Sequence, residues 1–480
     1  GRVWLAACIA GLSPAASTAP CDLAIVGAGP GGAFAAWRAA EAGRRVCVFE
    51  LGDRPGGRIR SMRGQGPRRD LVVEAGAYRF APKEVCEPMG NASWCIRTPI
   101  TAAIVKELGL HAGVYDPDPR NWDYQMRKLV DKNGHNVGYL TLVENMLERA
   151  AAHGAQLFFN TSVIGLSASN ASSLELRLVG AGGSRAEANA VLLNIPQKPL
   201  LKLLRHSGKP FVDMYSAPLY DPVAFPIMKL YVHYEDAWWR NYLGLTSGPF
   251  FNSNPSGGAS SVIHMHAVPD QQPAPLFGQY HDGDIRCDGP GGKCRGFLQA
   301  FYSGGVALDF YMPYHPMNGE AAVQLSQSSA EQRYLLKQVH QALVELHREA
   351  LDAVNATAYV NSSAPDSGVL SIWAEGVSGI NAGCHVPKAG KHPTEGGLPA
   401  AALQPFGRWP VFVANEAYGP VHCFAEGSLN MSSAALEAMG IPRPAWLDAE
   451  VRRQATQRGH IPAAPMDPFL FMGRVAAPPV

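Results

Sequence analysis

One stretch near the start of the chain restricts the possible folds more than any other. The apolar run Leu23–Val26 predicts a buried parallel strand and leads directly into a G-x-G-x-x-G motif, Gly27-Ala28-Gly29-Pro30-Gly31-Gly32. In a strand-to-helix turn, Gly27 permits the tight bend, Gly29 lets the backbone approach a pyrophosphate, and Gly32 lets the helix pack on the strand. The N-terminus of that helix faces the phosphate charge. This order predicts a Rossmann-type nucleotide site.

An acidic residue follows at the distance that such a site requires. After an alanine-rich helix that should end near Gly43, Arg45–Phe49 predicts a second strand, and Glu50 stands at its end. A carboxylate there accepts hydrogen bonds from a ribose 2′-hydroxyl and repels the 2′-phosphate of NADP. We therefore expect a dinucleotide with a free 2′-hydroxyl.

The continuation distinguishes FAD from NAD. Its residues, Arg54-Pro55-Gly56-Gly57-Arg58-Ile59-Arg60-Ser61, resemble the R-x-G-G-R-x-x-S/T signature of the flavin amine oxidase superfamily. The resemblance implies that Arg54, Gly57 and Arg58 contact the FAD diphosphate and ribityl chain. Six arginines between Arg54 and Arg69 also allow a heparin or nucleic-acid patch. We favour the diphosphate role for Arg58 and a solvated loop for most of the others.

A second motif resembles the L-amino acid oxidase branch of that superfamily, which includes secreted oxidases. It is the run Glu74-Ala75-Gly76-Ala77-Tyr78-Arg79-Phe80. The resemblance places Gly76, Ala77 and Tyr78 beside the flavin ring, and Arg79 at the substrate carboxylate. A planar two-pronged donor suits a carboxylate in a dry pocket. The alternative for Arg79 is a salt bridge at the surface or between domains.

Weaker matches lie in the middle of the chain. By the same resemblance, the backbone of Val163 meets adenine, and Lys229, on the apolar strand Pro226–Trp239, is bridged by water to flavin N5. A lysine on the inward face of such a strand is costly unless it has a partner. In the later strand Phe297–Tyr302, Phe301 or Tyr302 supplies an aromatic wall or a hydroxyl.

The C-terminal third resembles the other half of the flavin site. The resemblance places Trp373 beside the flavin and Glu416 at the ribityl hydroxyls. It also predicts a turn that points backbone N–H groups at the flavin, Cys423-Phe424-Ala425. The family usually has glycine where Asn415 stands and Gly-Trp in place of Cys423-Phe424, so the aromatic cage around the amine is altered.

Cysteine and asparagine patterns indicate the compartment. Cys86 with Cys95, and Cys287 with Cys294, each enclose a short polar loop and predict two disulfides, whereas Cys47, in a predicted strand, is expected to be a buried thiol. Residues 1–19 resemble the remains of a signal peptide. Six N-x-S/T sequons favour a secreted glycoprotein; they begin at Asn91, Asn160, Asn170, Asn355, Asn361 and Asn430.

Two further chemistries are weighed. By resemblance to monoamine oxidases, Cys384 is a candidate for a covalent bond to flavin, the alternatives being a free thiol or a disulfide. His264 and His266, with His281 and Asp282, allow a metal site, but no second spaced pair supports one, so no metal is expected.

The resemblance covers Leu23 to Ala435 and implies an α/β fold, with a discontinuous Rossmann-like FAD-binding domain and an α+β substrate domain that contains a mixed sheet. The expected segments are the signal remnant 1–19, FAD-binding parts 21–82, 151–200 and 371–440, a helical insertion 83–150, a substrate-binding domain 201–370, and a tail 441–480.

The implied reaction is oxidative deamination of an L-amino acid to a 2-oxo acid and ammonia, with O2 as acceptor and hydrogen peroxide as product. The alternatives are a monoamine or polyamine oxidase, and a non-catalytic binding glycoprotein that contains FAD. The net charge is only +1, which argues against a nucleic-acid partner. The sequence contains no run of about eighteen apolar residues, so it predicts no membrane-spanning helix. A homodimer remains possible.

Overall fold

The structure is a computed structural model that describes residues 20–89, 92–169, 173–181, 183–252, 274–289, 291–304, 307–316, 318–377, 379–388, 397–447 and 451. Several expectations lie outside these residues. They concern the signal remnant, the sequons at Asn91 and Asn170, the histidines His264 and His266, and nearly all of the tail.

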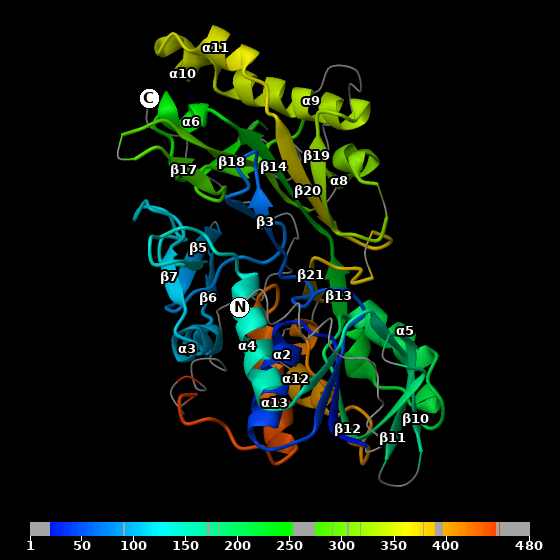
Figure 1. Ribbon diagram of the computed structural model, residues 1–480. Coiled ribbons are helices and arrows are strands. Elements are labelled where there is room, and N and C mark those ends of the chain that lie inside the picture. The colour runs from blue at the N-terminus through cyan, green and yellow to red at the C-terminus, as the bar shows by residue number, and fades with distance from the viewer. Residues whose placement is uncertain are drawn as a thin grey trace.

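A seven-stranded sheet forms the lower part of the molecule in Figure 1. Its strand order is β10-β11-β12-β1-β2-β9, and β22 pairs with β12. Pairing is parallel around β1, while β10 and β11 form an antiparallel extension. The strands are β1 (Cys21–Val26), β2 (Val46–Phe49), β9 (Gln156–Phe158), β10 (Thr161–Ala168), β11 (Leu174–Gly180), β12 (Arg185–Leu193) and β22 (Val411–Val413). The sheet therefore unites three segments that are far apart in the sequence.

Three helices pack on one another beside this sheet: α2 (Pro30–Glu41), α4 (Leu140–Ala152) and α13 (Ala425–Ala438). Helix α2 contacts both of the others. The close approach depends on glycine, since a Cβ on Gly31 would lie 2.2 Å from the Ser428 hydroxyl of α13.

A second sheet forms the upper part, with strand order β15-β16-β18-β14-β20-β19 and β17 beside β18. Every pairing in it is antiparallel, so it is not the mixed sheet that the sequence led us to expect. Its strands are β14 (Ile227–Tyr234), β15 (Pro249–Phe251), β16 (Phe277–Gln279), β17 (Ile285–Cys287), β18 (Cys294–Ser303), β19 (Ala322–Ser326) and β20 (Ser367–Trp373).

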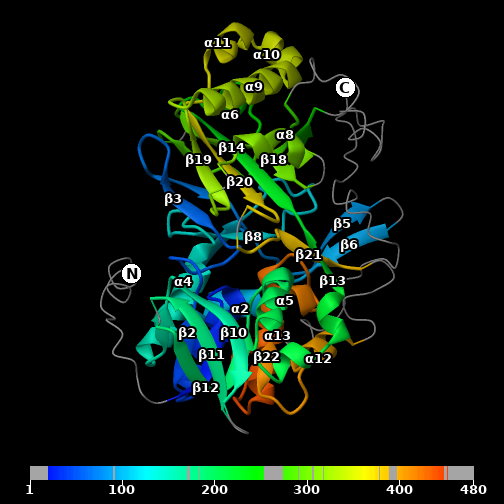
Figure 2. The ribbon, with the colours of Figure 1, turned by 90° about the vertical axis from the view of Figure 1, so that its right-hand side faces the viewer.

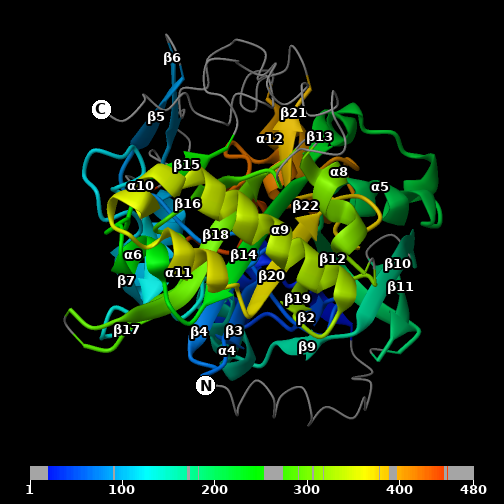
Figure 3. The ribbon, with the colours of Figure 1, turned by 90° about the horizontal axis from the view of Figure 1, so that it is seen from above.

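Helices cover the far face of this sheet (Figure 2), and α9 crosses above β14, β18 and β20 when seen from above (Figure 3). These helices are α9 (Ala330–Leu346), α10 (Arg348–Ala353) and α11 (Thr357–Ser362). Leu335, Val339 and Leu343 are fully buried on α9, and the Ser329 hydroxyl accepts a hydrogen bond from Gln332 N–H as its N-cap. The helical stretch is interrupted at His347, between α9 and α10.

The remaining elements connect or flank the two sheets. They are β3 (Ser61–Gln65), β4 (Leu71–Glu74), β5 (Val85–Met89), β6 (Ala92–Ile96), α3 (Pro99–Glu107), β7 (His111–Val114), β8 (Arg127–Val130), α5 (Gln197–Arg205), η1 (Phe211–Asp213), η2 (Ala217–Tyr220), β13 (Pro222–Phe225), α6 (Trp238–Asn241), α8 (Ala307–Tyr311), η4 (Met312–Tyr314), β21 (Cys384–Pro387), α12 (Leu398–Leu403) and η5 (Glu416–Tyr418). No described helix is both long and apolar enough to cross a membrane.

The stretch 83–150, expected to be helical, holds two β-hairpins, β5–β6 and β7–β8, besides α3 and α4. Thr141 and Glu144 have the spacing of a capping box, but α4 begins at Leu140 and has no side-chain cap. Both side chains instead accept hydrogen bonds from Arg63, at 2.8 and 2.9 Å. The hydrogen bonds to Arg63, which is distant in the sequence, therefore replace the local capping bonds.

Four disulfides link described residues. Cys86–Cys95 and Cys287–Cys294 confirm the two predicted pairs. Cys47 is not a free thiol, because it pairs with Cys21 across the neighbouring strands β1 and β2. The fourth disulfide joins Cys384 to Cys423, which are 39 residues apart in the sequence.

Candidate active site

A cavity of about 680 Å³ lies where the two sheets meet. It is lined by the glycine turn before α2, the end of β2, the loop around residue 57, the start of β10, strand β14, and the turn before α13. One end is bordered by the glycine turn before α2 and by Glu50, and the other end by Lys229, Trp373 and Phe424. The two ends are described separately below.

The glycine turn builds the first end as predicted. Gly27 has a φ of +99°, and a Cβ on Gly32 would lie 2.0 Å from the Gly27 carbonyl oxygen. Gly27, Gly29 and Pro30 line the cavity, whereas Gly31 and Gly32 face the packing side of α2 and do not. The turn thus leaves the start of α2 open toward the cavity, where a phosphate would meet the helix N-terminus.

Glu50 is held by two backbone donors. Its Oε2 accepts from Ala28 N–H at 2.7 Å and its Oε1 from Gly52 N–H at 2.9 Å. Burial raises the pKa of Glu50, and these donors act against the rise. Each carboxylate oxygen keeps a second lone pair for a ribose hydroxyl.

The two signature arginines have different surroundings. Arg58 lines the cavity, pairs with Glu416 and donates to the Gly383 carbonyl. Arg54 does not line the described cavity, since its guanidinium donates to the carbonyls of Pro55, Gly57 and Ile59. Arg54 therefore fixes the shape of the loop that presents Gly57, which does line the cavity.

Glu416 lies between an arginine and a histidine on the cavity wall. It pairs with Arg58, and the His385 ring Nδ1 lies 2.5 Å from its Oε1. Burial raises its pKa, but the charges of Arg58 and His385 more than offset that effect, and the net shift is well downward. His385 was missed from sequence, because nothing in Cys384-His385 indicates that it meets Glu416.

Lys229 is buried at the second end, on the central strand β14. Its Nζ donates to the carbonyls of Glu74, at 3.1 Å, and Gly76, at 2.8 Å. It also lies 3.4 Å from the centre of the Tyr78 ring. Burial lowers the pKa of Lys229 to about 7, although nearby carboxylates act in the opposite direction. An amine with this pKa exchanges a proton near neutral pH.

Side chains of the antiparallel sheet donate hydrogen bonds to the backbone of the turn that follows β4. Trp373 Nε1 donates to the Ala75 carbonyl at 2.8 Å, alongside the Lys229 bonds to its neighbours. Gly76 and Ala77 line the cavity, and a Cβ on Gly76 would meet the Arg58 carbonyl at 2.0 Å. Side chains of the second sheet thus set the backbone position of this turn.

Of the remaining predicted site residues, some line the cavity and others do not. Many of them line the cavity, namely Val163, Tyr302, Trp373, Asn415, Cys423, Phe424 and Ala425. Tyr78 and Arg79 do not belong to the described lining. Arg79 Nη1 donates to Asp123 at 3.1 Å in a buried ion pair, and its role toward a substrate carboxylate stays a prediction. Asp123 was not considered from the sequence, since it lies in a polar loop with no motif.

The disulfide between Cys384 and Cys423 changes one expectation. While both sulfurs are bonded to each other, Cys384 has no thiolate to bond covalently to a flavin. Of the alternatives considered for Cys384, the disulfide is the one found.

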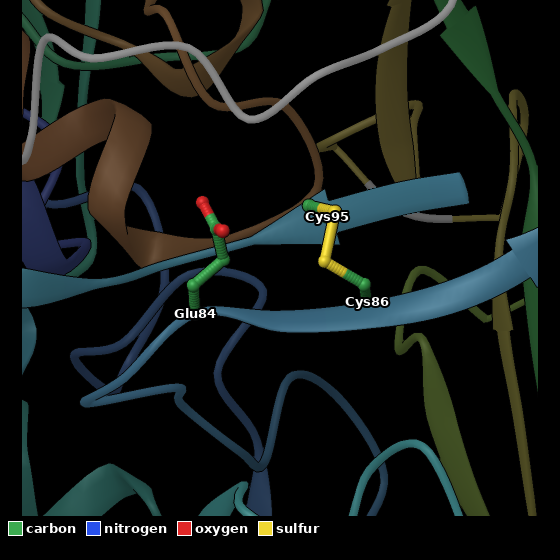
Figure 4. Close-up of side chains that lie close together, drawn as sticks. All are labelled: Glu84, Cys86 and Cys95. Carbon is green, nitrogen blue, oxygen red and sulfur yellow. A yellow bond between two sulfur atoms is a disulfide. The ribbon is translucent and has the colours of Figure 1, made fainter. Parts of the chain in front are cut away.

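Three described clusters have spacing suited to a metal, and the third, His233, Glu235 and Asp366, lies on and beside β14, away from the cavity lining. The surroundings of the other two do not suit an ion. Glu84, Cys86 and Cys95 lie close together, yet Figure 4 shows the two sulfurs joined in a disulfide, which offers no thiolate. Asp116, Asp123 and His281 form a buried cluster, but Asp123 is already paired with Arg79. Asp282, considered with His281 above, accepts hydrogen bonds from Tyr231 and Gln299.

Comparisons with known proteins agree with this geometry. A family model described as an NAD(P)-binding Rossmann-like domain matches residues 25–86. An L-glutamate oxidase precursor of Streptomyces viridosporus is 43% identical over 79 residues, which span 15% of this chain and only 12% of that protein.

Solved structures match over most of the chain. A double mutant and a single mutant of putrescine oxidase, both from work on redesign of cofactor binding, superpose with a TM-score of 0.52 at 16% and 15% identity. Each comparison covers 88% of this chain and 99% of the other. Identity this low shows the fold alone. The chain has an amine oxidase-like fold, in which a Rossmann-like parallel sheet adjoins a separate antiparallel sheet.

Proposed function

We propose that this protein is a secreted FAD-dependent oxidase that oxidatively deaminates L-amino acids. The observation that carries the proposal is the position of Lys229. A buried amine, 2% exposed, stands at one end of a cavity whose other end is built for a dinucleotide. A buried lysine is costly to retain without a function or a partner.

The chemistry of the donors fits FAD at the end bordered by the glycine turn. Glu50 would bind a ribose, the start of α2 would face the diphosphate, and Arg58 with Glu416 would hold the ribityl region; all of them line the cavity. Bound FAD would supply hydride acceptance from the amine carbon and reoxidation by O2 to hydrogen peroxide. The protein would contribute positioning and exclusion of water.

At the other end, Lys229 would hold or release a proton near neutral pH, hydrogen-bonded to the turn that carries Gly76 and Ala77. Phe424 and Trp373 would form the walls beside the substrate amine. Arg79, close behind that wall, would attract the carboxylate. The short similarity to an L-glutamate oxidase precursor supports an amino acid as substrate.

One observation favours a second candidate, a monoamine oxidase. Because Arg79 is already paired with Asp123, an amine without a carboxylate would need no exchange of partners. A polyamine is less suited, since the only acids among the described lining residues are Glu50 and Glu416, both on the cofactor side.

Four disulfides among the described residues support folding in an oxidising compartment, in keeping with a secreted protein. The partners proposed are the amine substrate and O2.

A coupled peroxide assay tests the proposal on purified protein with its bound flavin. Substrates are the L-amino acids, their decarboxylated amines, and polyamines. Peroxide from amino acids alone supports the first candidate, and peroxide from amines alone supports the second. No peroxide from any of them, with flavin bound, would favour a non-catalytic binding glycoprotein.

A further inference from the structure

Arg79 lies in a box of aromatic rings closed by one acid. Its guanidinium carbon is 4.9 to 5.3 Å from the ring centres of Tyr78, Tyr115 and Trp122. Asp123 accepts its hydrogen bond at 3.1 Å, and both side chains are nearly inaccessible. Cation–π contacts hold the guanidinium, while Asp123 neutralises it.

Asp123 is itself fixed from behind. The His281 ring lies between two carboxylates, with Nδ1 3.2 Å from Asp116 and Nε2 3.6 Å from Asp123. Burial raises the pKa of Asp123, but the nearby His281 ring and the charge of Arg79 shift it downward overall. Asp123 is therefore ionised at neutral pH.

This box adjoins the Lys229 end of the cavity. The Tyr78 ring lies between Arg79, at 5.2 Å, and Lys229, at 3.4 Å. Tyr302 and Phe424, which line the cavity, pack against the same aromatic cluster. One layer of aromatic side chains thus separates Arg79 from the cavity. The charge of Arg79 is neutralised by Asp123.

We propose that Asp123 determines the substrate class of this site by competing with the substrate carboxylate for Arg79. The inference rests on the proposed function. An L-amino acid must draw Arg79 away from Asp123, whereas the corresponding amine makes no such demand. Asp123 is a positioning residue, since it acts through Arg79 and touches neither substrate nor cofactor.

The test uses the flavin-containing protein and the variant Asp123→Asn, which keeps the shape of the side chain and removes its charge. Propionate, a carboxylate without an amine, is titrated by calorimetry. We expect its Kd to fall about tenfold, because one charge-assisted competitor is lost. The ratio of KM for an L-amino acid to KM for its decarboxylated amine should fall by a similar factor.

Asp116→Asn is the matched control, since Asp116 is equally buried and touches His281 but not Arg79. It should leave propionate binding unchanged. If Asp123→Asn does not accumulate as folded protein, Asp123→Ser removes the same charge and leaves room for water, with the same expected shift.

Unchanged or weaker propionate binding in the Asp123 variants would overturn the inference and make Asp123 purely structural. An equal gain in the Asp116 variant would overturn it too. Because propionate binding needs no turnover, this result is distinct from a failure of the proposed function, which would appear as an absence of peroxide from the unaltered protein.

Discussion

The two ends of the cavity are built in different ways. At the nucleotide end, glycine-rich backbone from one stretch of chain, around Gly27, Gly29 and Gly57, forms part of the lining, and the side chains of Glu50, Arg58 and Glu416 complete it. At the substrate end, Lys229, Trp373 and Phe424 come from elements far apart in the sequence. A local motif can specify much of the first end, whereas the second depends on which side chains meet after folding.

If that contrast is correct, the largest effect should come from the closest backbone contact of the nucleotide end. Gly32→Ala puts a Cβ about 2.0 Å from the Gly27 carbonyl, and the helix cannot shift without losing the turn. We expect loss of folded, yellow protein, at a cost of about 3 kcal/mol or more. Expression and flavin content measure this.

Gly43→Ala is the control for that substitution. Gly43 has a φ of +78°, but its Cβ would meet nothing within 4 Å. Only backbone strain of about 1 kcal/mol is expected. Equal damage in both variants would mean that close packing at Gly32 is not what the turn requires.

At the substrate end, Lys229→Met should separate catalysis from cofactor binding. The substitution removes a buried amine whose pKa is about 7. We expect anaerobic flavin reduction to slow by about 100-fold or more, with flavin content retained. The control is Lys337→Met on the exposed face of α9. Loss of flavin from the Lys229 variant would contradict the division of the two ends.

A pH series tests the first turn of α13, which borders both ends. Burial raises the pKa of Glu426 to about 7, although it accepts hydrogen bonds from Ile100 and Thr101 of α3. The folded state thus prefers the protonated acid, so the contribution of Glu426 to the free energy of unfolding should be highest below pH 4.5 and fall as pH rises to about 7. For one group the fall is about 3 kcal/mol.

Denaturant unfolding at several pH values measures this slope. Glu74, whose pKa burial also raises to about 7, contributes with the same sign, so Glu426→Gln should remove only its own share of the decline. Glu107→Gln, at an exposed position of α3, should leave the slope unchanged. Equal slopes in the original protein and the Glu426 variant would refute the assignment.

The smallest effect is expected away from both ends. Ser329→Ala removes the N-cap bond of α9 and should lower the free energy of unfolding by about 1 kcal/mol without altering flavin content or turnover. Ser328→Ala, beside it and not the cap, should change less. A change in turnover would show that α9 is coupled to the cavity.

The same contrast explains what the sequence could predict. The nucleotide-binding unit from Gly27 to Glu50 could be predicted because its strand, turn and acid follow one another in the sequence. The N-cap at Ser329 likewise depends only on residues close to it in the sequence. Thr141 and Glu144 have the spacing of a capping box, yet both side chains accept hydrogen bonds from Arg63 instead. Cys47 looked like a core thiol because its partner, Cys21, lies 26 residues away on the neighbouring strand.

Arg79 illustrates the limit most clearly. Its motif predicts that it lies near the flavin, but its partner, Asp123, is in a loop that carries no pattern. The placement of an ion pair depends on tertiary contacts that a single sequence does not encode locally.

The most direct test of the account is anaerobic reduction of the bound flavin. Addition of an L-amino acid, or of its amine, should bleach the yellow absorbance of the purified protein. Admission of O2 should restore the colour and release hydrogen peroxide in proportion to the flavin. A flavin that stays oxidised with every amine offered would contradict the claim that this cavity is an oxidase active site.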